Sequence, residues 1–367
     1  MAENAVLWDN SYMNRIKDII LNFDLGVSSK DKMIVFGLFF LYFLVGYVID
    51  GTTRLMWMHW VGAYAIAVII FFVGKKYYQD KGYKNVFAFM FPKDIWTSSS
   101  AINDCIIAVI NSFLARFLYV VMSIGPIAAA GVVGFYAADA LSLPQTEAAP
   151  TFMVIALYTV FTLLASDFSY YWAHRLAHTF PVWWEFHKVH HSAEVMTPIT
   201  LLRYHPLDDL IYSVFRHVGS SITAGVFLFM YPSIEGAATI LSTNVIVFAF
   251  NLLGSNLRHS HIWLSYGPVL SYILISPAMH HIHHSEAEKH WDRNFGAIFS
   301  IWDWMFGTIY VPKEREEIKF GIGEPEENFN TVPKLYIGPF IRSFALMKTA
   351  DGYKIGLANK PGKTDEN

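Results

Sequence analysis

The sequence contains a single cysteine, Cys105, among 367 residues. One thiol cannot form an intramolecular disulfide. It also cannot build a cysteine-rich zinc site or a conventional iron–sulfur cluster, because each of these needs several thiolates. Any metal that this chain binds must therefore be held by nitrogen or oxygen atoms.

Charged residues are scarce as well. They make up 16% of the chain, against about a quarter in a typical soluble domain. Hydrophobic residues make up 54% of it. Lysine plus arginine total 27 and aspartate plus glutamate total 30, so nothing indicates a basic surface for a nucleic acid. This composition predicts a multi-pass membrane protein.

Long apolar runs are present where charge is missing. A helix needs about 20 residues to cross a bilayer, and the sequence predicts six spans, at 33–49, 55–74, 117–138, 151–171, 211–231 and 236–256. Lysine and arginine gather before the first span and after the second, whereas the loops 138–150 and 231–236 contain neither. The positive-inside rule therefore predicts that the chain after 171 and after 256 lies on the cytoplasmic face. We expect 95–116 and 262–279 to lie along the membrane interface.

Histidine is concentrated in one part of the chain, since 14 of the 15 histidines lie between residues 174 and 290. The motifs "HRLAH", "HKVHH" and "HHIHH" repeat spacings of three or four residues, which place side chains on one face of a helix. Together with one histidine of "RHSH" at 258–261, they offer nine or ten imidazoles on the predicted cytoplasmic side: His174, His178, His187, His190, His191, His280, His283, His284, and His259 or His261. His281 is out of phase and is expected to face elsewhere.

The number of imidazoles favours two metal ions, because one zinc ion is satisfied by about four ligands. Imidazole binds Fe, Zn, Cu and Ni, so ligand type does not select the metal. A site at the membrane face indicates a lipid substrate. A zinc-dependent membrane hydrolase stays open, although no H-E-x-x-H motif is present, and so does a non-enzymatic metal transporter, although the spans carry few polar ligands. A membrane haem protein is disfavoured because the histidines lie past the ends of the spans.

Several further polar residues are candidates for hydrogen bonds to the ligands or the substrate. Asp167 lies two turns before His174 on the same face of its helix, so its carboxylate could orient that ring. His205 precedes a proline in "RYHP". The candidates are Asp167, Glu194, His205, Asp208, His261, Asp292 and Asn294.

Five segments, "DFSYYWAHRLAH", "WEFHKVHHSAE", "TLLRYHP", "MHHIHHS" and "DRNFGAIFSIWDWMFGT", closely resemble the fatty acid hydroxylase and sterol desaturase superfamily of integral-membrane di-iron oxygenases. The resemblance covers about 155–310 and implies an all-α, multi-pass transmembrane helical protein with a cytosolic histidine-rich helical cap. It implies a catalytic domain at 151–311. That domain would follow an N-terminal cytosolic segment (1–32) and N-terminal transmembrane helices (33–150), and would precede a polar, irregular C-terminal tail (312–367).

The resemblance also implies chemistry. The metal ligands would be the eight histidines of the three motifs, with His259 as the ninth, while His261 stands where an asparagine is common in the family. Members use two Fe ions, O₂ as co-substrate and two electrons to hydroxylate or desaturate sterols, fatty acyl chains or ether lipids. No G-x-G-x-x-G motif is present, so an external donor is expected, such as a b-type cytochrome or a ferredoxin with its reductase. The membrane would be the endoplasmic reticulum or a bacterial inner membrane.

Overall fold

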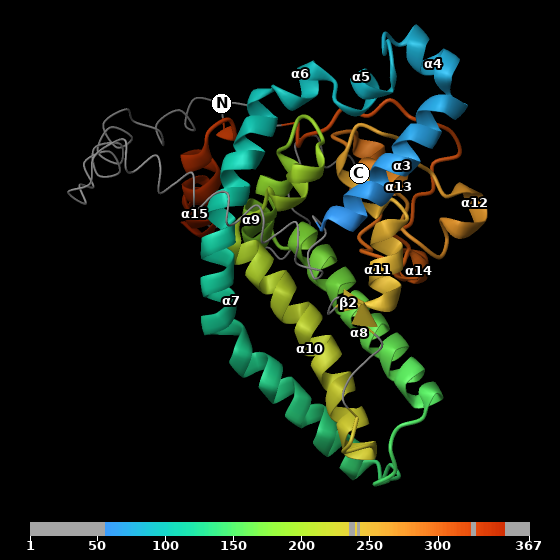
Figure 1. Cartoon of the computed structure of the whole chain (residues 1–367). Coiled ribbons are helices and arrows are strands. Elements are labelled where there is room, and N and C mark those ends of the chain that lie inside the picture. Colours follow the sequence, from blue (N-terminus) through green and yellow to red (C-terminus); the bar gives the residue numbers. More distant parts are fainter. Residues whose placement is uncertain (1–55, 235–238, 241–242, 324–327, 349–367) are drawn as a thin grey trace, which may run out of the picture. The chain divides into compact units, whose positions relative to one another are not determined.

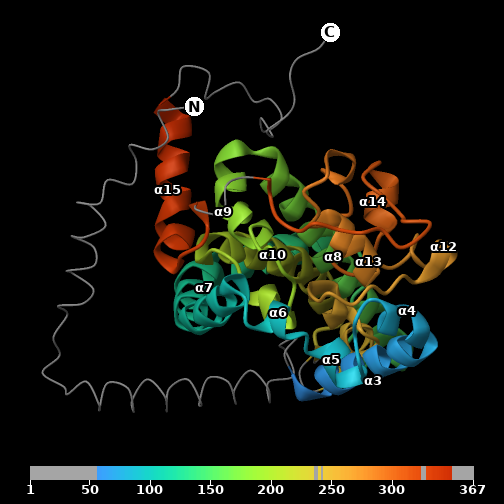
Figure 2. The ribbon, with the colours of Figure 1, turned by 90° about the horizontal axis from the view of Figure 1, so that it is seen from above.

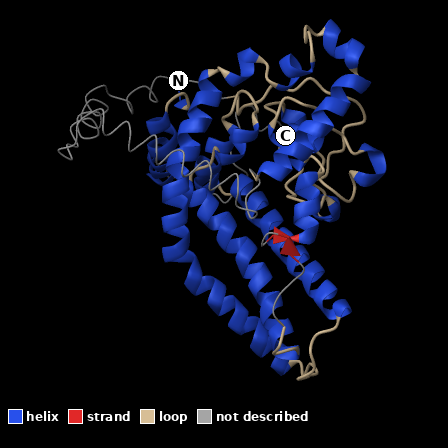
Figure 3. Cartoon of the chain, viewed as in Figure 1, coloured by secondary structure: helices blue, strands red, loops and turns tan. Residues whose placement is uncertain are grey.

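The computed structural model describes residues 56–234, 239–240, 243–323 and 328–348 (Figure 1). All of them belong to the unit Tyr47–Asn367. The predicted N-terminal segment 1–32 and the predicted span 33–49 lie outside the described residues. The described part is mostly helical, as predicted, and its strands β1 (Thr239–Ile240) and β2 (Thr243–Asn244) form one small antiparallel pair (Figure 3).

Three long helices pack side by side below the histidine-rich region, with α10 (Pro206–Met230) between α7 (Ser99–Ala140) and α8 (Phe152–Thr179) (Figure 1). Small residues let their backbones approach closely. A Cβ added to Gly225 of α10 would lie 2.0 Å from the carbonyl oxygen of Gly131 in α7, and one added to Gly219 would lie 2.5 Å from that of Ala165 in α8. Such crossings are typical of helices that pack within a membrane.

The lengths of these helices differ from the predicted spans. Within the described residues, α8 alone is long and apolar enough over its length to meet the criterion for a membrane-crossing helix, while Trp57–Val73 and Ile124–Ala140 are shorter apolar helices. The predicted interfacial helix 95–116 and the predicted span 117–138 are one continuous helix, α7. It begins at the cap Ser98, whose hydroxyl accepts a hydrogen bond from the Ala101 N–H, and continues through Pro126.

The sixth predicted span, 236–256, is wrong as a continuous helix. Its described residues form the two short strands and then α11 (Val245–Leu252). The side chain of Asn244 caps α11 at the Ile246 N–H and donates to the Thr159 carbonyl, so this helix begins late. At the other end, Gly254 takes a positive φ of 89° and ends the helical path.

Short helices build the region above the three long ones, as Figure 1 shows from the side and Figure 2 from above. They are α9 (Pro181–His191), η2 (Pro198–Leu202), η3 (Ser255–His259), α12 (Gly267–Leu270), α13 (Pro277–His283), η4 (Glu288–His290) and α14 (Ile301–Met305). The helices α3 (Trp57–Val73), α4 (Lys75–Asp80), α5 (Val86–Met90) and α6 (Lys93–Trp96) precede α7. The predicted interfacial segment 262–279 contains α12 and the start of α13.

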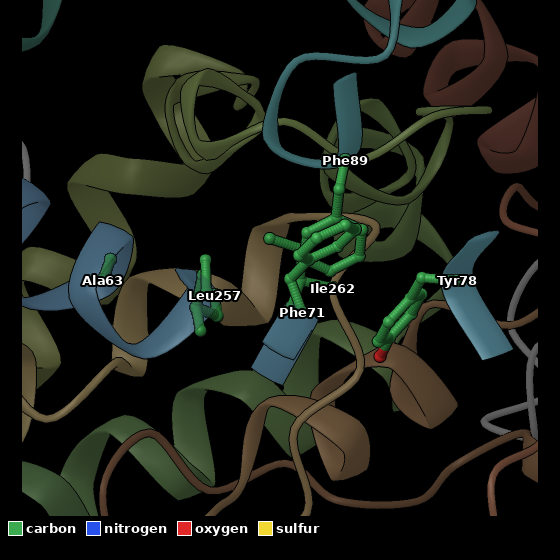
Figure 4. Packing of buried hydrophobic residues seen from close by; sticks show 7 residues of the cluster. Ala63, Phe71, Tyr78, Phe89, Leu257 and Ile262 are labelled. Carbon is green, nitrogen blue, oxygen red and sulfur yellow. The ribbon is translucent and has the colours of Figure 1, made fainter. Parts of the chain in front are cut away.

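A buried hydrophobic cluster attaches the loop after η3 to the N-terminal helices. Phe71 of α3 and Phe89 of α5 pack with Leu257 of η3 and Ile262, and Tyr78 of α4 closes the cluster (Figure 4). The rings of Tyr78 and Phe89 lie 4.5 Å apart between centroids. This packing fixes the position of the "RHSH" segment.

The predicted irregular tail from 312 is wrong over Val332–Lys348, which form helix α15 against α9. Leu335 and the nearby Phe329 are buried against Val189 of α9 and Ile107 of α7. The helical spacing of Val332, Leu335 and Tyr336 was the available signal, and Pro339 inside the helix obscured it.

Candidate metal centre

Nine histidines converge in the upper part of the structure from four elements and form two groups. The first group is His174, His178, His187, His191 and His283, and the second is His190, His259, His280 and His284. Within each group one ring nitrogen per residue lies within 4.8 Å of the others. These are the nine residues that the sequence pattern and the family resemblance predict as ligands.

The histidines of one motif do not all enter the same group, although their three-residue and four-residue spacings place them on one side of a helix. In α9, His187 and His191 enter the first group, but His190 enters the second. In α13 and the residue after it, His283 enters the first group, whereas His280 and His284 enter the second. Both helices therefore lie between the groups and serve each of them, and the rings of His191 and His284 are 4.4 Å apart between centroids.

Hydrogen bonds from Nδ1 orient several of these rings. His174 donates to the carbonyl of Phe295 at 2.8 Å, and His283 donates to that of Arg293 at 2.8 Å. His190 donates to the carbonyl of Arg203 at 3.1 Å. A proton held on Nδ1 leaves the lone pair of Nε2 for a metal, which is the usual arrangement around ligating histidines.

His187 has a carboxylate as its partner. Its Nδ1 donates to Asp208 Oδ2 at 2.9 Å, and Asp208 Oδ1 accepts from Trp183 Nε1 at 2.8 Å. Asp208 is 3% exposed. Asp292 stands near the same group, with Oδ1 3.8 Å from Nδ1 of His178. Asp208 and Asp292, both candidates from the sequence, therefore contact histidines of the first group.

The distances between ring nitrogens fit shared metal ions. The Nε2 atoms of His259 and His280 are 3.0 Å apart, and those of His280 and His284 are 3.1 Å apart. Two nitrogens at about 2.1 Å from one ion lie about 3.0 Å apart at a right angle and about 3.4 Å apart at the tetrahedral angle. Nε2 of the buried His174 has no hydrogen-bond partner among the described residues, as expected of an atom reserved for a metal.

Burial disfavours the protonated form of several of these imidazoles. It lowers the pKa of His190 to about 3, with the neighbouring His187 adding to the effect. It also lowers the pKa of His191, His280 and His284, and nearby imidazoles lower each further. A metal ligand must be deprotonated, so these rings are ready to coordinate at neutral pH.

Three sequence candidates lie outside both groups, and each has another partner. Nε2 of His261 donates to the Phe89 carbonyl at 2.6 Å, because Ser260 is fully extended and turns the next side chain away from the centre. Nε2 of His205 donates to the Tyr336 carbonyl, and its Nδ1 accepts from the Leu207 N–H. Glu194 lines a separate cavity of about 340 Å³ beside Ser100 and Lys319. As expected, His281 is also outside, with Nε2 at the Leu257 carbonyl.

Asp167 and Asn294 support the centre indirectly. The expectation that Asp167 orients a histidine ring is not met, because its carboxylate accepts the backbone N–H groups of Ile298 and Phe299 and the indole N–H of Trp302. Asn294 bridges α13 and the chain after α14, donating to the carbonyls of Met279 and Tyr310. Asp167 therefore positions the segment that follows Phe295, whose carbonyl holds His174.

Sequence reasoning missed two buried carboxylates that build the same scaffold. Asp303 accepts from the N–H groups of Phe295 and Gly296 at 2.8 Å each. Asp104 of α7 pairs with Arg203 at 2.9 Å, and Arg203 in turn places the carbonyl that holds His190. The "WDW" of α14 and the isolated acid in the apolar start of α7 were the available signals, since buried charges are rare unless paired.

A cavity of about 280 Å³ opens beside the second group. Its wall includes His190, His259 and His280 of that group, and His187 of the first. Side chains of η2, α8 and α10, and Arg258 next to His259, complete the wall: Tyr170, Leu201, Leu202, Tyr204, Asp208, Asp209, Tyr212, Ser213, Arg216 and Arg258. The centre can therefore be reached from this side by a molecule of moderate size.

A helical scaffold that carries two adjacent groups of histidines defines a class, and comparison with known sequences agrees with it. Residues 159–308 match the fatty acid hydroxylase family. This matched stretch belongs to the fatty acid hydroxylase and sterol desaturase superfamily.

Particular relatives share this domain. The chain is 31% identical to an alkylglycerol monooxygenase of Homo sapiens, over 46% of this chain and 34% of the relative. It is 31% identical to a delta(7)-sterol 5(6)-desaturase of Gibberella zeae, over 47% and 44%, and 30% identical to an ornithine lipid hydroxylase of Rhizobium tropici, over 46% of each. The match thus spans between a third and a half of the length of these relatives. No solved structure matches the chain.

Proposed function

We propose that this protein is a membrane-bound di-iron oxygenase that uses O₂ and two electrons to hydroxylate or desaturate a C–H bond of a lipid. The observation that carries the proposal is the pair of adjacent histidine groups, with five and four imidazoles, beside a cavity. The similar alkylglycerol monooxygenase, sterol desaturase and ornithine lipid hydroxylase support a lipid as the substrate.

The proposed ligands are the nine histidines of the two groups, so that one iron ion would be held by each group. Iron is favoured over zinc because the relatives are named as monooxygenases, hydroxylases and desaturases, whose reactions need a redox metal. Two bound iron ions would supply the electrons and coordination positions that O₂ activation requires. The residues of this chain hold the ring orientations: Asp208 and the carbonyls of Phe295, Arg293 and Arg203 each fix one Nδ1–H.

The membrane placement is part of the proposal. The lower part of α8 exposes large apolar side chains, among them Phe152 (84% exposed), Met153 (64%) and Phe161 (51%). A bilayer would cover these side chains, and His174 and His178 of the first group lie at the opposite end of the same helix. The distribution of lysine and arginine in the sequence supports the cytoplasm as the histidine side, where an external b-type cytochrome or a ferredoxin with its reductase would deliver electrons.

The proposal is tested by the metal content of detergent-purified protein from cells grown with iron-57. We expect about two iron ions per chain, seen as an antiferromagnetically coupled pair by Mössbauer spectroscopy, with O₂ consumption after reduction in the presence of a lipid. Zinc that persists after expression in iron-rich medium, with no O₂ consumption after iron reconstitution, would overturn it. That result would favour the zinc-dependent hydrolase or the metal transporter.

A further inference from the structure

Arg258 is a buried cation beside the second histidine group. Its side chain is 3% exposed, and its guanidinium lies 5.4 Å from the ring centroid of Phe250. Its Nε and Nη2 atoms have no hydrogen-bond partner among the described residues, and no described carboxylate forms a salt bridge with it. Arginine stays charged in proteins. Burial of a guanidinium whose N–H groups lack acceptors therefore costs folding free energy, unless a bound ligand supplies the acceptors.

The other fully buried arginine shows how this protein satisfies a guanidinium that has a structural role. Arg203 is 2% exposed, and its donors reach Asp104 at 2.9 Å, the Ser192 hydroxyl at 2.9 Å and the Val189 carbonyl at 3.1 Å. Arg258 has no comparable set of acceptors. The contrast indicates that Arg258 is placed for something other than holding the fold.

The position of Arg258 points to the cavity. Arg258 forms part of its wall together with His259 and His280, and its charge acts on His280. The acids on the same wall are engaged elsewhere: Asp208 accepts from His187 and Trp183, and Asp209 interacts with Arg216. In Arg258, an incoming molecule would therefore meet a buried cation with unused donors beside the proposed metal ligands.

We propose that Arg258 binds an anionic oxygen of the lipid substrate, a carboxylate or phosphate oxygen, and so places carbons close to the polar end of the lipid against the second histidine group. This inference rests on the proposed function, since it takes the cavity as the lipid site. A guanidinium presents several N–H donors in a rigid fork that matches such oxyanions. Within the broad substrate class proposed above, an acyl or ether lipid with an anionic head is favoured over a sterol, whose single hydroxyl carries no charge to pair with the guanidinium.

The first part of the test is stability without lipid. In the full-length protein in neutral detergent, R258M removes an unpaired buried charge and retains an unbranched apolar chain. We expect its melting temperature to equal or exceed that of the wild type. R203M is the matched control, because it leaves Asp104 buried without its partner, and we expect its melting temperature to fall. A fall for R258M as large as that for R203M would show that Arg258 is structural and would overturn the inference.

The second part is lipid binding, measured by native mass spectrometry with oleate, dioleoyl phosphatidate and dioleoylglycerol. The wild type should bind at least one of the two anionic lipids about ten-fold or more tightly than dioleoylglycerol, as a charge-assisted hydrogen bond in a buried site predicts. A preference for oleate identifies a carboxylate, and one for phosphatidate identifies a phosphate. R258M should lose the preference, R258K should retain part of it, and K289Q, which alters an exposed cation outside the cavity, should keep it.

Equal binding of all three lipids by the wild type, or an equal loss of preference in K289Q and R258M, would overturn the inference. The binding measurement needs neither electrons nor O₂. An inactive protein that still selects anionic lipids through Arg258 would therefore contradict only the proposed oxygenase function, whereas an active protein without that selectivity would contradict only the role of Arg258.

Discussion

Asp208 offers the sharpest test of how this chain would hold a metal. The D208N substitution keeps the size of the side chain and removes its charge. Asp208 is 3% exposed and accepts both the Nδ1–H of His187 at 2.9 Å and the Trp183 indole N–H at 2.8 Å. The carboxylate fixes the tautomer of His187 and strengthens its Nε2 as a donor to metal. Loss of such a partner typically costs about 10–100-fold in metal affinity, or about 1.4–2.7 kcal/mol.

The assay is anaerobic Fe(II) titration of the apoprotein against a chelator of known affinity. Asp292 provides the matched control, because it is also a carboxylate facing a histidine of the first group. Its side chain is 44% exposed and its oxygen lies 3.8 Å from His178 Nδ1, so solvent screens it. We expect D292N to change the affinity by less than about three-fold. Wild-type affinity in D208N, or an equal loss in D292N, would refute the reasoning.

Three further outcomes follow from the contacts. R203M should lower the free energy of unfolding by about 3–5 kcal/mol, because Asp104 is left buried without its partner, and chemical denaturation of the R203M and D104N/R203M proteins should show partial recovery in the double variant. G225A should lower the melting temperature, since its Cβ would lie 2.0 Å from a carbonyl of α7, whereas G125A, with no atom within 4 Å, should not. H261A should leave the iron content unchanged, because His261 hydrogen-bonds to a backbone carbonyl outside both groups; elemental analysis showing a loss of iron would contradict that placement.

Local spacing in the sequence was enough to identify the histidines as candidate ligands. It was not enough to predict which of them belong to which of the two groups. The i, i+3 and i+4 pattern puts His187, His190 and His191 on one face of α9, which holds in the structure. Whether they meet one ion or two depends on how α9 packs against both α8 and α13, a long-range arrangement that no local pattern contains. The choice of His259 over His261 depends on a single extended residue, Ser260, after η3.

The errors in the fold have related physical causes. Hydropathy identifies apolar stretches but not helix ends. The prediction therefore divided α7 into an interfacial helix and a separate span, although nothing between Ser98 and Pro126 breaks the helix. In the region of the sixth span, Asn244 and Gly254 interrupt an apolar run through a cap and a positive φ. The groups that orient the rings were largely invisible, because the carbonyls of Phe295 and Arg293 carry no side-chain signature.

The two histidine groups differ in their surroundings, and this difference determines where a substrate can enter. The first group has five buried imidazoles, of which His187 lines the cavity, whereas the second has four, of which His190, His259 and His280 line it. An ion held by four protein ligands has coordination positions left for other molecules more readily than one held by five.

Ser213 of α10 faces the same cavity, so S213F should fill the lipid site while leaving the ligands in place. We expect normal iron content with lipid-dependent O₂ consumption reduced at least about ten-fold, in line with steric exclusion from a productive geometry. Undiminished lipid-dependent O₂ consumption in S213F, at normal iron content, would show that the lipid reaches the centre by another route.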